Sequence, residues 1–168
     1  MDPIPVIPFR MGAKELLEEV QRVFPPVEKP GGLELSFHKV GCGDCAYLRT
    51  ELEKYTGREL PVDAIRWIAT EMSCLSAKGW RWVLPSYLKW CVGVDDTYNG
   101  LPTEFLIYTL APNIKRQKET RQRMSELNGE QIACLVHFIE WCASHEYWSD
   151  YCPEEISLAH DYLCSIRV

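Results

Sequence analysis

The chain has 168 residues, of which 46% are hydrophobic, and its formal net charge is −6 at pH 7. This length allows one hydrophobic core, and the negative charge disfavours a nucleic-acid binder, which would offer a basic surface to phosphates. No uncharged stretch approaches the roughly 20 apolar residues that span a bilayer, and no basic region precedes an apolar run at the amino end. We therefore expect a cytoplasmic protein with reduced thiols and with no nucleic-acid or membrane partner. The oligomeric state does not follow from the sequence.

Prolines dominate the start of the chain. Pro3, Pro5 and Pro8 predict an extended arm over residues 1–12, because proline cannot donate a backbone hydrogen bond. Residues 13–168 show no break in composition. We expect them to form one mainly α-helical domain, a multi-helix bundle.

The first helix is expected from Ala13, where apolar residues recur at helical spacing, to the pair Pro25-Pro26, which ends it. The alternation in residues 33–37 indicates a short strand or hairpin, with a loop as the alternative. A second amphipathic helix is expected from Tyr47 to near Gly57, because glycine suits a left-handed helix end.

The middle of the chain predicts two more helices. Pro61 suits the first turn of one helix, whose apolar residues continue to Leu75. Ser76 can cap the next helix, which Pro85 is expected to kink or split. Turn-forming residues in 93–101 predict a loop.

Helical patterns also fill the last third of the chain. Pro102 begins a short apolar segment that periodicity cannot assign to helix or strand, and a basic helix is expected after it. Asn128 is placed to cap the strongest predicted helix, with Gln131 completing a capping box. Apolar residues cover two faces of that helix, which indicates a central position. The last helix is expected from Pro153.

His38, Cys42 and Cys45 form a cluster with the local spacing of metal ligands. Two cysteines separated by two residues can chelate one zinc ion, but a closed structural site needs four ligands. The fourth would have to come from the other histidines, which are His137, His145 and His160. The alternatives are a redox pair and two reduced thiols that help to start a helix. We expect no cofactor by default, with zinc as the alternative.

A second possible metal pair is His137 with Glu140, three residues apart on the central helix. The simpler interpretation is a histidine that is hydrogen-bonded within the core.

Two further patterns could bind a protein partner. Five cations lie close together, at Lys115, Arg116, Lys118, Arg121 and Arg123. They are typical of a solvated helix face, on which Glu119 can pair with them, or of a surface for an acidic partner. Aromatic and acidic residues gather after the central helix, at Trp141, Glu146, Tyr147, Trp148, Asp150 and Tyr151. They indicate either core residues or the anchors of an interface.

Three segments are informative together, namely Leu75–Leu88, Thr103–Leu106 and Leu127–Gln131, the last followed by the helix through Phe138. They resemble DUF6714, a family of small uncharacterised bacterial proteins. The cysteine pair preceded by His38 is also similar to a feature of some members. The resemblance implies a mostly helical bacterial cytosolic protein and names no reaction.

The function expected from these observations is non-enzymatic. The sequence has no phosphate-binding glycine loop, nucleophile elbow or paired-carboxylate motif. The leading hypothesis is an interaction domain, a bacterial immunity or antitoxin-type protein whose acidic surface binds a basic toxin domain. The alternative is a small zinc- or thiol-dependent protein centred on His38, Cys42 and Cys45.

Overall fold

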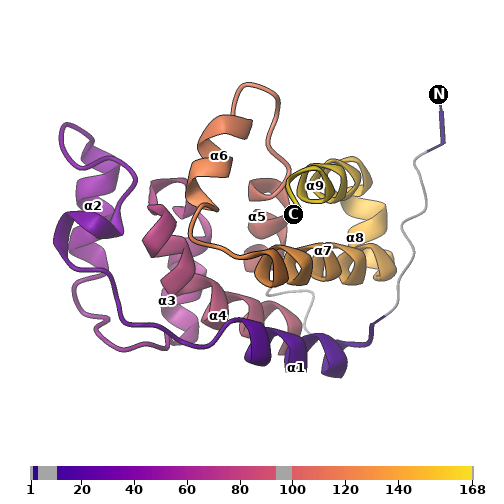
Figure 1. The fold of residues 1–168 in the computed structure, drawn as a ribbon, viewed down its shortest axis with the longest axis horizontal. Coiled ribbons are helices and arrows are strands. Elements are labelled where there is room, and N and C mark those ends of the chain that lie inside the picture. Colours follow the sequence, from indigo (N-terminus) through magenta and orange to yellow (C-terminus); the bar gives the residue numbers. More distant parts are fainter. Residues whose placement is uncertain (1, 4–10, 94–99, 168) are drawn as a thin grey trace.

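The structure, a computed structural model, describes residues 2–3, 11–93 and 100–167, and all its helices and 3-10 helices lie in these ranges (Figure 1). In chain order they are α1 (Ala13–Val23), η1 (Gly32–Leu35), α2 (Gly43–Glu51), α3 (Val62–Ala69), η2 (Met72–Cys74), α4 (Ala77–Gly93), α5 (Leu101–Thr109), α6 (Gln117–Arg123), α7 (Gly129–Ser144), α8 (Glu146–Tyr151) and α9 (Pro153–Ile166). The predicted mainly α-helical bundle is therefore confirmed. No helix in the described ranges has the length and apolar character needed to cross a membrane. Most of the expected arm over residues 1–12 and most of the expected 93–101 loop lie outside the described residues.

Helix α7 occupies the centre of the bundle, as its two apolar faces predict. It packs against α1, α8 and α9, while α1 also packs against α4. The predicted capping box is present: the backbone N–H of Gln131 donates to Asn128 Oδ1 at 2.9 Å, and the backbone N–H of Asn128 donates to Gln131 Oε1 at 3.0 Å. Gln131 Nε2 also donates to the carbonyl of Val23 at 2.9 Å. That carbonyl is in the last turn of α1, so the Gln131 side chain caps the start of α7 and also hydrogen-bonds a free carbonyl at the end of α1.

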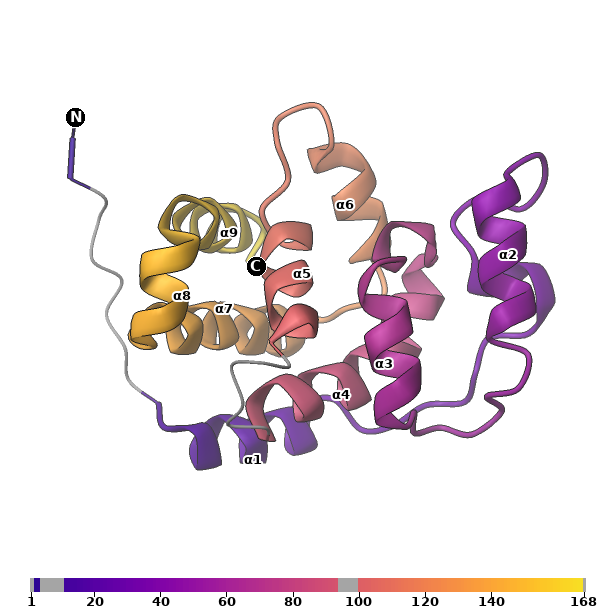
Figure 2. The ribbon, with the colours of Figure 1, turned by 180° about the vertical axis from the view of Figure 1, so that it is seen from behind.

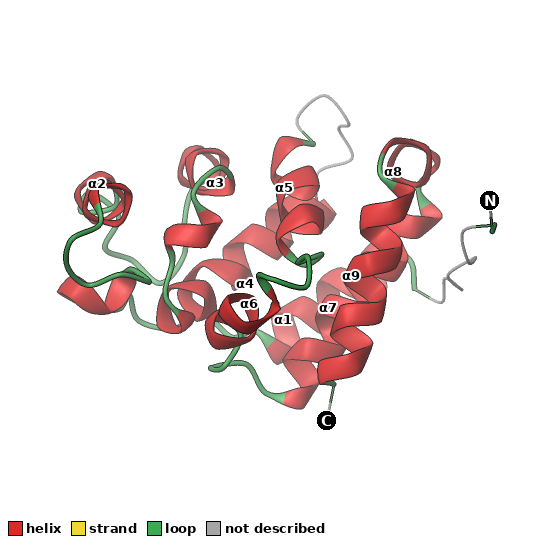
Figure 3. Cartoon of the chain, turned by 90° about the horizontal axis from the view of Figure 1, so that it is seen from above, coloured by secondary structure: helices red, strands yellow, loops and turns green. Residues whose placement is uncertain are grey.

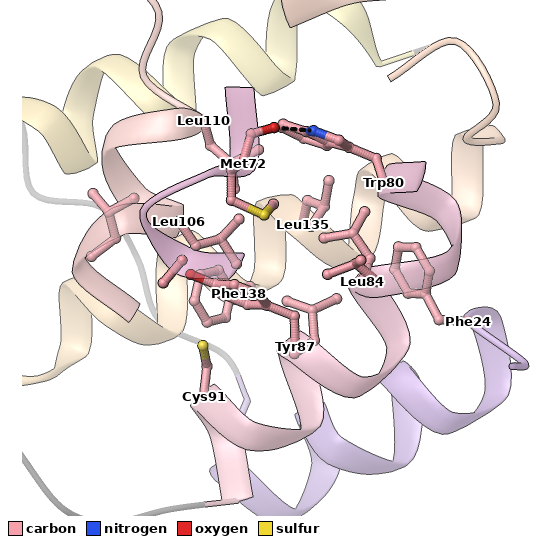
Figure 4. Close-up of a cluster of buried hydrophobic side chains, with 14 of the residues drawn as sticks. Phe24, Met72, Trp80, Leu84, Tyr87, Cys91, Leu106, Leu110, Leu135 and Phe138 are labelled. Atoms are coloured by element: carbon pink, nitrogen blue, oxygen red, sulfur yellow. Dashed lines mark hydrogen bonds between the residues drawn. The ribbon is translucent and has the colours of Figure 1, made fainter. Parts of the chain in front are cut away.

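Large aromatic side chains fill the core between α4, α5 and α7 (Figure 4). Trp80 and Tyr87 on α4 are fully buried, and each finds a partner for its polar atom. Trp80 Nε1 donates to the carbonyl of Met72 at 3.0 Å, and the Tyr87 hydroxyl donates to the carbonyl of Pro102 at 2.5 Å. Helix α4 is continuous through Pro85, so the expected split does not occur.

The strand expected over residues 33–37 is wrong for most of its length. Gly32–Leu35 is a 3-10 helix, and Ser36 makes a single antiparallel bridge with Leu75. The carbonyl of Leu35 accepts a hydrogen bond from the backbone N–H of Ser76 at 3.0 Å. The chain here crosses the start of α4, which leaves no room for a longer ladder.

Two helices end earlier than expected. Helix α2 ends at Glu51 rather than near Gly57, because the carbonyl of Leu52 accepts hydrogen bonds from Lys29 Nζ at 2.5 Å and from the backbone N–H of Tyr55 at 3.1 Å. Helix α3 ends at Ala69, and η2 follows it as a separate turn. Helix α8 was not expected as an element of its own.

Helix α2 lies at one end of the molecule and α8 lies toward the other in all three ribbon views (Figures 1, 2 and 3). Helix α2 packs against the two 3-10 helices, η1 and η2. The segment between η1 and α2 carries His38 and Cys42, and η2 ends in Cys74. Several potential metal ligands therefore come from adjacent elements.

Candidate metal site

The structure brings His38, Cys42 and Cys45 together at the start of α2. Cys42 is the residue before the first turn of the helix, and Cys45 lies in that turn. Gly41 has a φ of 78°, a left-handed conformation that glycine adopts easily, and it turns the chain back between His38 and the helix. One ligand atom from each of the three residues lies within 4.8 Å of the others.

The spacing of these atoms is close to that of a zinc site. With Zn–S bonds of about 2.3 Å and Zn–N bonds of about 2.0 Å, tetrahedral angles put sulfur and nitrogen about 3.5 Å apart and two sulfurs about 3.8 Å apart. Cys45 Sγ lies 3.7 Å from His38 Nδ1. Only small movements are needed to admit an ion among the three atoms.

The backbone of His38 is held against α2. Ser36 Oγ donates to the His38 carbonyl at 2.9 Å, and Arg49 Nη1 donates to the same carbonyl at 3.2 Å. Arg49 Nη1 also lies 2.6 Å from Ser36 Oγ. The ring of Phe37 packs edge-on to the His38 ring, with centroids 5.0 Å apart. These contacts fix the position of the imidazole relative to the helix that carries the thiols.

The thiols around the site differ in acidity. The backbone N–H and then the side chain of Cys45 hydrogen-bond to Cys42 and lower the pKa of its thiol. Burial, together with the neighbouring Cys45, raises the pKa of Cys74 to about 12. Since the thiolate is the form that binds metals and attacks electrophiles, Cys42 is the more reactive of these two residues.

Arg123 borders the site, and the expectation that it lies on a solvated helix face is wrong. It is 8% exposed, and its guanidinium lies over the Phe37 ring, 4.1 Å from the centroid. Glu119 is 3.7 Å away, as the expected pairing predicts. Buried Arg123 Nε has no hydrogen-bond partner among the described residues. Thr120 and Met124 are also buried, and with Arg123 they stand at positions i, i+3 and i+4 of a helix. Residues with this spacing share one helix face, so the sequence carried a signal that Arg123 faces inward.

Electrostatics couple Arg123 to the cysteines. Burial lowers the pKa of Arg123, while the charge of Glu119 and negative charge on Cys74 and Cys45 raise it. The buried cation is therefore favoured by thiolates at this end of the molecule.

The other three histidines do not join the cluster. His137 Nδ1 lies 2.8 and 2.9 Å from the two carboxylate oxygens of Glu19, and His160 Nε2 lies 3.2 Å from Glu140 Oε1. His145 Nδ1 donates to the carbonyl of Trp141 at 2.8 Å. These histidines lie on α9, on α7 or directly after α7, far from α2 (Figure 1). The expectation that the fourth ligand is a histidine is wrong, and His137 is hydrogen-bonded within the bundle as the simpler interpretation predicted.

The aromatic and acidic residues after α7 separate into two sets. Trp141 and Trp148 are buried, whereas Tyr147 and Tyr151 are about half exposed. The rings of Tyr147 and Tyr151 stack, with centroids 5.7 Å apart and an interplanar angle of 14°. The Tyr151 hydroxyl donates to Glu104 Oε1 on α5 at 3.2 Å. Two acids on α8 are also exposed, namely Glu146 and Asp150.

The predicted basic residues lie elsewhere. Lys115, Arg116 and Arg121 are exposed on α6 and the turn before it, and α6 lies apart from α8 in the ribbon views (Figures 1, 2 and 3). Arg121 Nη1 donates to the carbonyl of Ile166 at 3.3 Å. The basic and aromatic patterns therefore do not form one surface, and each stays a separate prediction for partner binding.

Fold and site together define an all-α protein in which one imidazole and two thiols converge where a helix begins. A family model matches residues 13–152, and the chain belongs to that family, DUF6714, a family of unknown function. No curated protein and no solved structure matches the chain. The family description names no activity, so the residues of the site are the basis for inferring a function.

Proposed function

We propose that this protein binds one zinc ion through His38, Cys42 and Cys45. The observation that carries the proposal is the convergence of three ligand atoms within 4.8 Å of one another. Thiolate and imidazole ligands together are typical of zinc sites, and cysteine pairs with this spacing recur in them. The lowered pKa of Cys42 supports the proposal, because metal binding requires the thiolate.

The ion would connect the start of α2 to the loop before it. Helix α2 packs mainly against the short η1 and η2, with Cys45 and Leu48 buried, so the ion would add a cross-link to these contacts. Zinc in this position contributes to stability, as structural zinc does in other small domains.

The test is metal analysis of the full chain purified with a reducing agent and without chelator, combined with native mass spectrometry. We expect one zinc per chain, and no zinc in the double variant Cys42→Ser with Cys45→Ser. Cys164→Ser is the matched control, because Cys164 is an exposed cysteine on α9. A wild-type chain that takes up no zinc on titration would overturn the proposal.

Thiol redox chemistry is the competing use of the same pair. In that use Cys42, the more exposed thiol, would attack an external disulfide, and Cys45, which is 1% exposed with its Sγ 3.8 Å from the carbonyl of Cys74, would resolve it. A Cys42–Cys45 disulfide that forms reversibly in a zinc-loaded sample, with release of the metal, would favour this alternative.

A second candidate function is protein binding by what we call the tyrosine surface, which consists of Tyr147, Tyr151, Glu104, Glu146 and Asp150. The stacked, half-exposed pair of tyrosines favours it, because exposed rigid aromatic side chains are common anchors of interfaces. The surrounding carboxylates suit a basic partner, of which a toxin domain is one example.

This second function can be tested by affinity capture with paired variants. We expect Tyr147→Ala with Tyr151→Ala to lose a specific partner, and Lys115→Ala with Arg116→Ala to retain it. The reverse result would assign binding to the basic segment, and an acidic partner would follow.

We also propose that the protein works in a reducing compartment, namely the cytoplasm of a bacterium. The support is its cysteines, all eight of which are free thiols and six of which are buried. Reduced thiols persist in the cytoplasm, whereas secreted proteins pair them.

A further inference from the structure

A fourth cysteine lies beside the cluster although it is distant in sequence. Cys74 ends η2, and its carbonyl accepts a hydrogen bond from the backbone N–H of Phe37 at 2.8 Å. The bridge between Ser36 and Leu75 fixes the two segments next to each other. The residues directly before His38 and the residue Cys74 are thus held together by the backbone.

Cys74 is also in contact with the cluster. Cys45 Sγ lies 3.8 Å from the Cys74 carbonyl, and Cys45 is one of the neighbours that raise the pKa of Cys74. Cys74 Sγ itself lies 3.8 Å from Glu71 Oε2, outside the group of three ligand atoms. To join the cluster, the Cys74 side chain has to leave the Glu71 contact and rotate about its Cα–Cβ bond.

Burial, Cys45, Glu71 and Asp44 raise the pKa of Cys74, and Arg123 is the buried cation nearby that compensates a third thiolate. A zinc ion with two thiolates, one neutral imidazole and one water is neutral, whereas three thiolates and one imidazole give the centre one negative charge. Arg123 is a buried cation beside Cys74 and Cys45, and its only close carboxylate in the described ranges is Glu119, at 3.7 Å. A centre with one negative charge stabilises this guanidinium better than a neutral centre does.

From these observations we propose that Cys74 is the fourth ligand of the zinc ion, which makes a closed site of three cysteines and one histidine. This inference rests on the proposed zinc function and extends it. On binding, the Cys74 thiol loses its proton to solvent and forms a Zn–S bond in place of a bound water. The ion then joins α2 to η2, across the 29 residues that separate Cys45 from Cys74, and its role is structural, since a closed site leaves no position for a substrate.

The first test is X-ray absorption spectroscopy at the zinc edge on the full wild-type chain, which needs no variant. We expect three sulfurs at about 2.3 Å and one nitrogen at about 2.0 Å from the zinc. Two sulfurs with two lighter ligands would overturn the role of Cys74 and leave the proposed function intact. A chain that binds no zinc would overturn both.

The second test is cobalt titration of Cys74→Ser, with Cys164→Ser as the control. We expect the thiolate-to-cobalt charge-transfer band of Cys74→Ser to fall from the intensity of three Co–S bonds to that of two. Loss of an outer-shell partner typically weakens metal binding about 10- to 100-fold. We expect the zinc affinity of Cys74→Ser to fall by more than this, because a direct ligand is removed. Unchanged cobalt spectra and unchanged zinc affinity in Cys74→Ser would overturn the proposal. If the charge-transfer band and zinc binding are lost only in Cys42→Ser with Cys45→Ser, the proposal is overturned and the three-residue site still stands.

Discussion

The imidazole of His137 and the carboxylate of Glu19 join helices α7 and α1 across 118 residues of sequence. His137 Nδ1 lies 2.8 Å from one carboxylate oxygen and 2.9 Å from the other. Glu19 is 8% exposed. A buried carboxylate needs such a partner, because an uncompensated buried charge is strongly destabilising.

Replacing this carboxylate should therefore reduce stability. We expect Glu19→Gln to lower the free energy of unfolding by about 1.5–3 kcal/mol, the range for hydrogen bonds that involve charged groups. Urea denaturation at pH 7 measures the change. Glu15→Gln on the exposed side of the same helix is the control. An equal decrease in the free energy of unfolding of both variants would show that the contact with His137 does not stabilise the protein.

Gly79 in helix α4 should tolerate no side chain. Alanine is normally better than glycine inside a helix by about 1 kcal/mol. A Cβ atom at Gly79 would lie 2.6 Å from the carbonyl oxygen of Leu35, which is backbone and cannot move aside easily. We expect Gly79→Ala to destabilise the protein by about 1–3 kcal/mol, as overpacking does.

Thermal or urea unfolding shows whether Gly79→Ala lowers or raises the stability of the protein. Gly93→Ala is the matched control, because nothing lies within 4 Å of a Cβ atom at that position in the same helix. Stabilisation by both substitutions would show that the contact with Leu35 relaxes freely.

The buried thiols should make stability fall in alkali. Burial raises the pKa of Cys91 to about 12, whereas an unfolded thiol titrates near pH 8.5. Because the unfolded chain loses this proton first, the contribution of the thiol is fully present below about pH 8.5 and is lost as the pH rises toward about 12. Each such thiol adds a slope of up to about 1.4 kcal/mol per pH unit.

This pH dependence can be assigned with a variant. We expect the free energy of unfolding of Cys91→Ala, measured in reducing buffer from pH 7 to 10.5, to fall less steeply above pH 9 than that of the wild type. Cys164→Ala, at an exposed position, should change the slope less. Parallel curves for all three proteins would contradict the role of Cys91.

Arg123 should strengthen zinc binding through its positive charge, without contacting the metal itself. We expect Arg123→Gln to weaken zinc binding about 10- to 100-fold, as changes to outer-shell partners do, while the ligand count by X-ray absorption stays the same. The control is Arg121→Gln, an exposed arginine two residues away on the same helix. An unchanged zinc affinity in Arg123→Gln would remove the charge argument for three thiolates.

Much of the helical architecture was predictable because local signals agree with the tertiary packing. The capping box of Asn128 and Gln131, the stop at Pro25-Pro26 and the start at Pro153 are all encoded within one turn of the helix end. The sequence-based predictions of secondary structure are wrong where residues distant in sequence determine the local conformation. The early end of α2 depends on Lys29, and the 3-10 helix at Gly32–Leu35 depends on the start of α4.

The candidate site was predictable only in part for the same reason. The spacing of His38, Cys42 and Cys45 is local and visible in the sequence. The position of Cys74 depends on the pairing of Ser36 with Leu75, and no periodicity in either segment indicates that pairing. The burial of Arg123 likewise depends on the ring of Phe37, which lies far away in sequence.

The long separation between α1 and its partner α7 also matters while the chain is being made. At 5–20 residues per second, the 118 residues between Glu19 and His137 take on the order of 10 s to synthesise. During that time α4 can cover one side of α1, but the side that receives α7 stays bare. The nascent chain is therefore open to chaperones and proteases until α7 has left the ribosome and can cover α1.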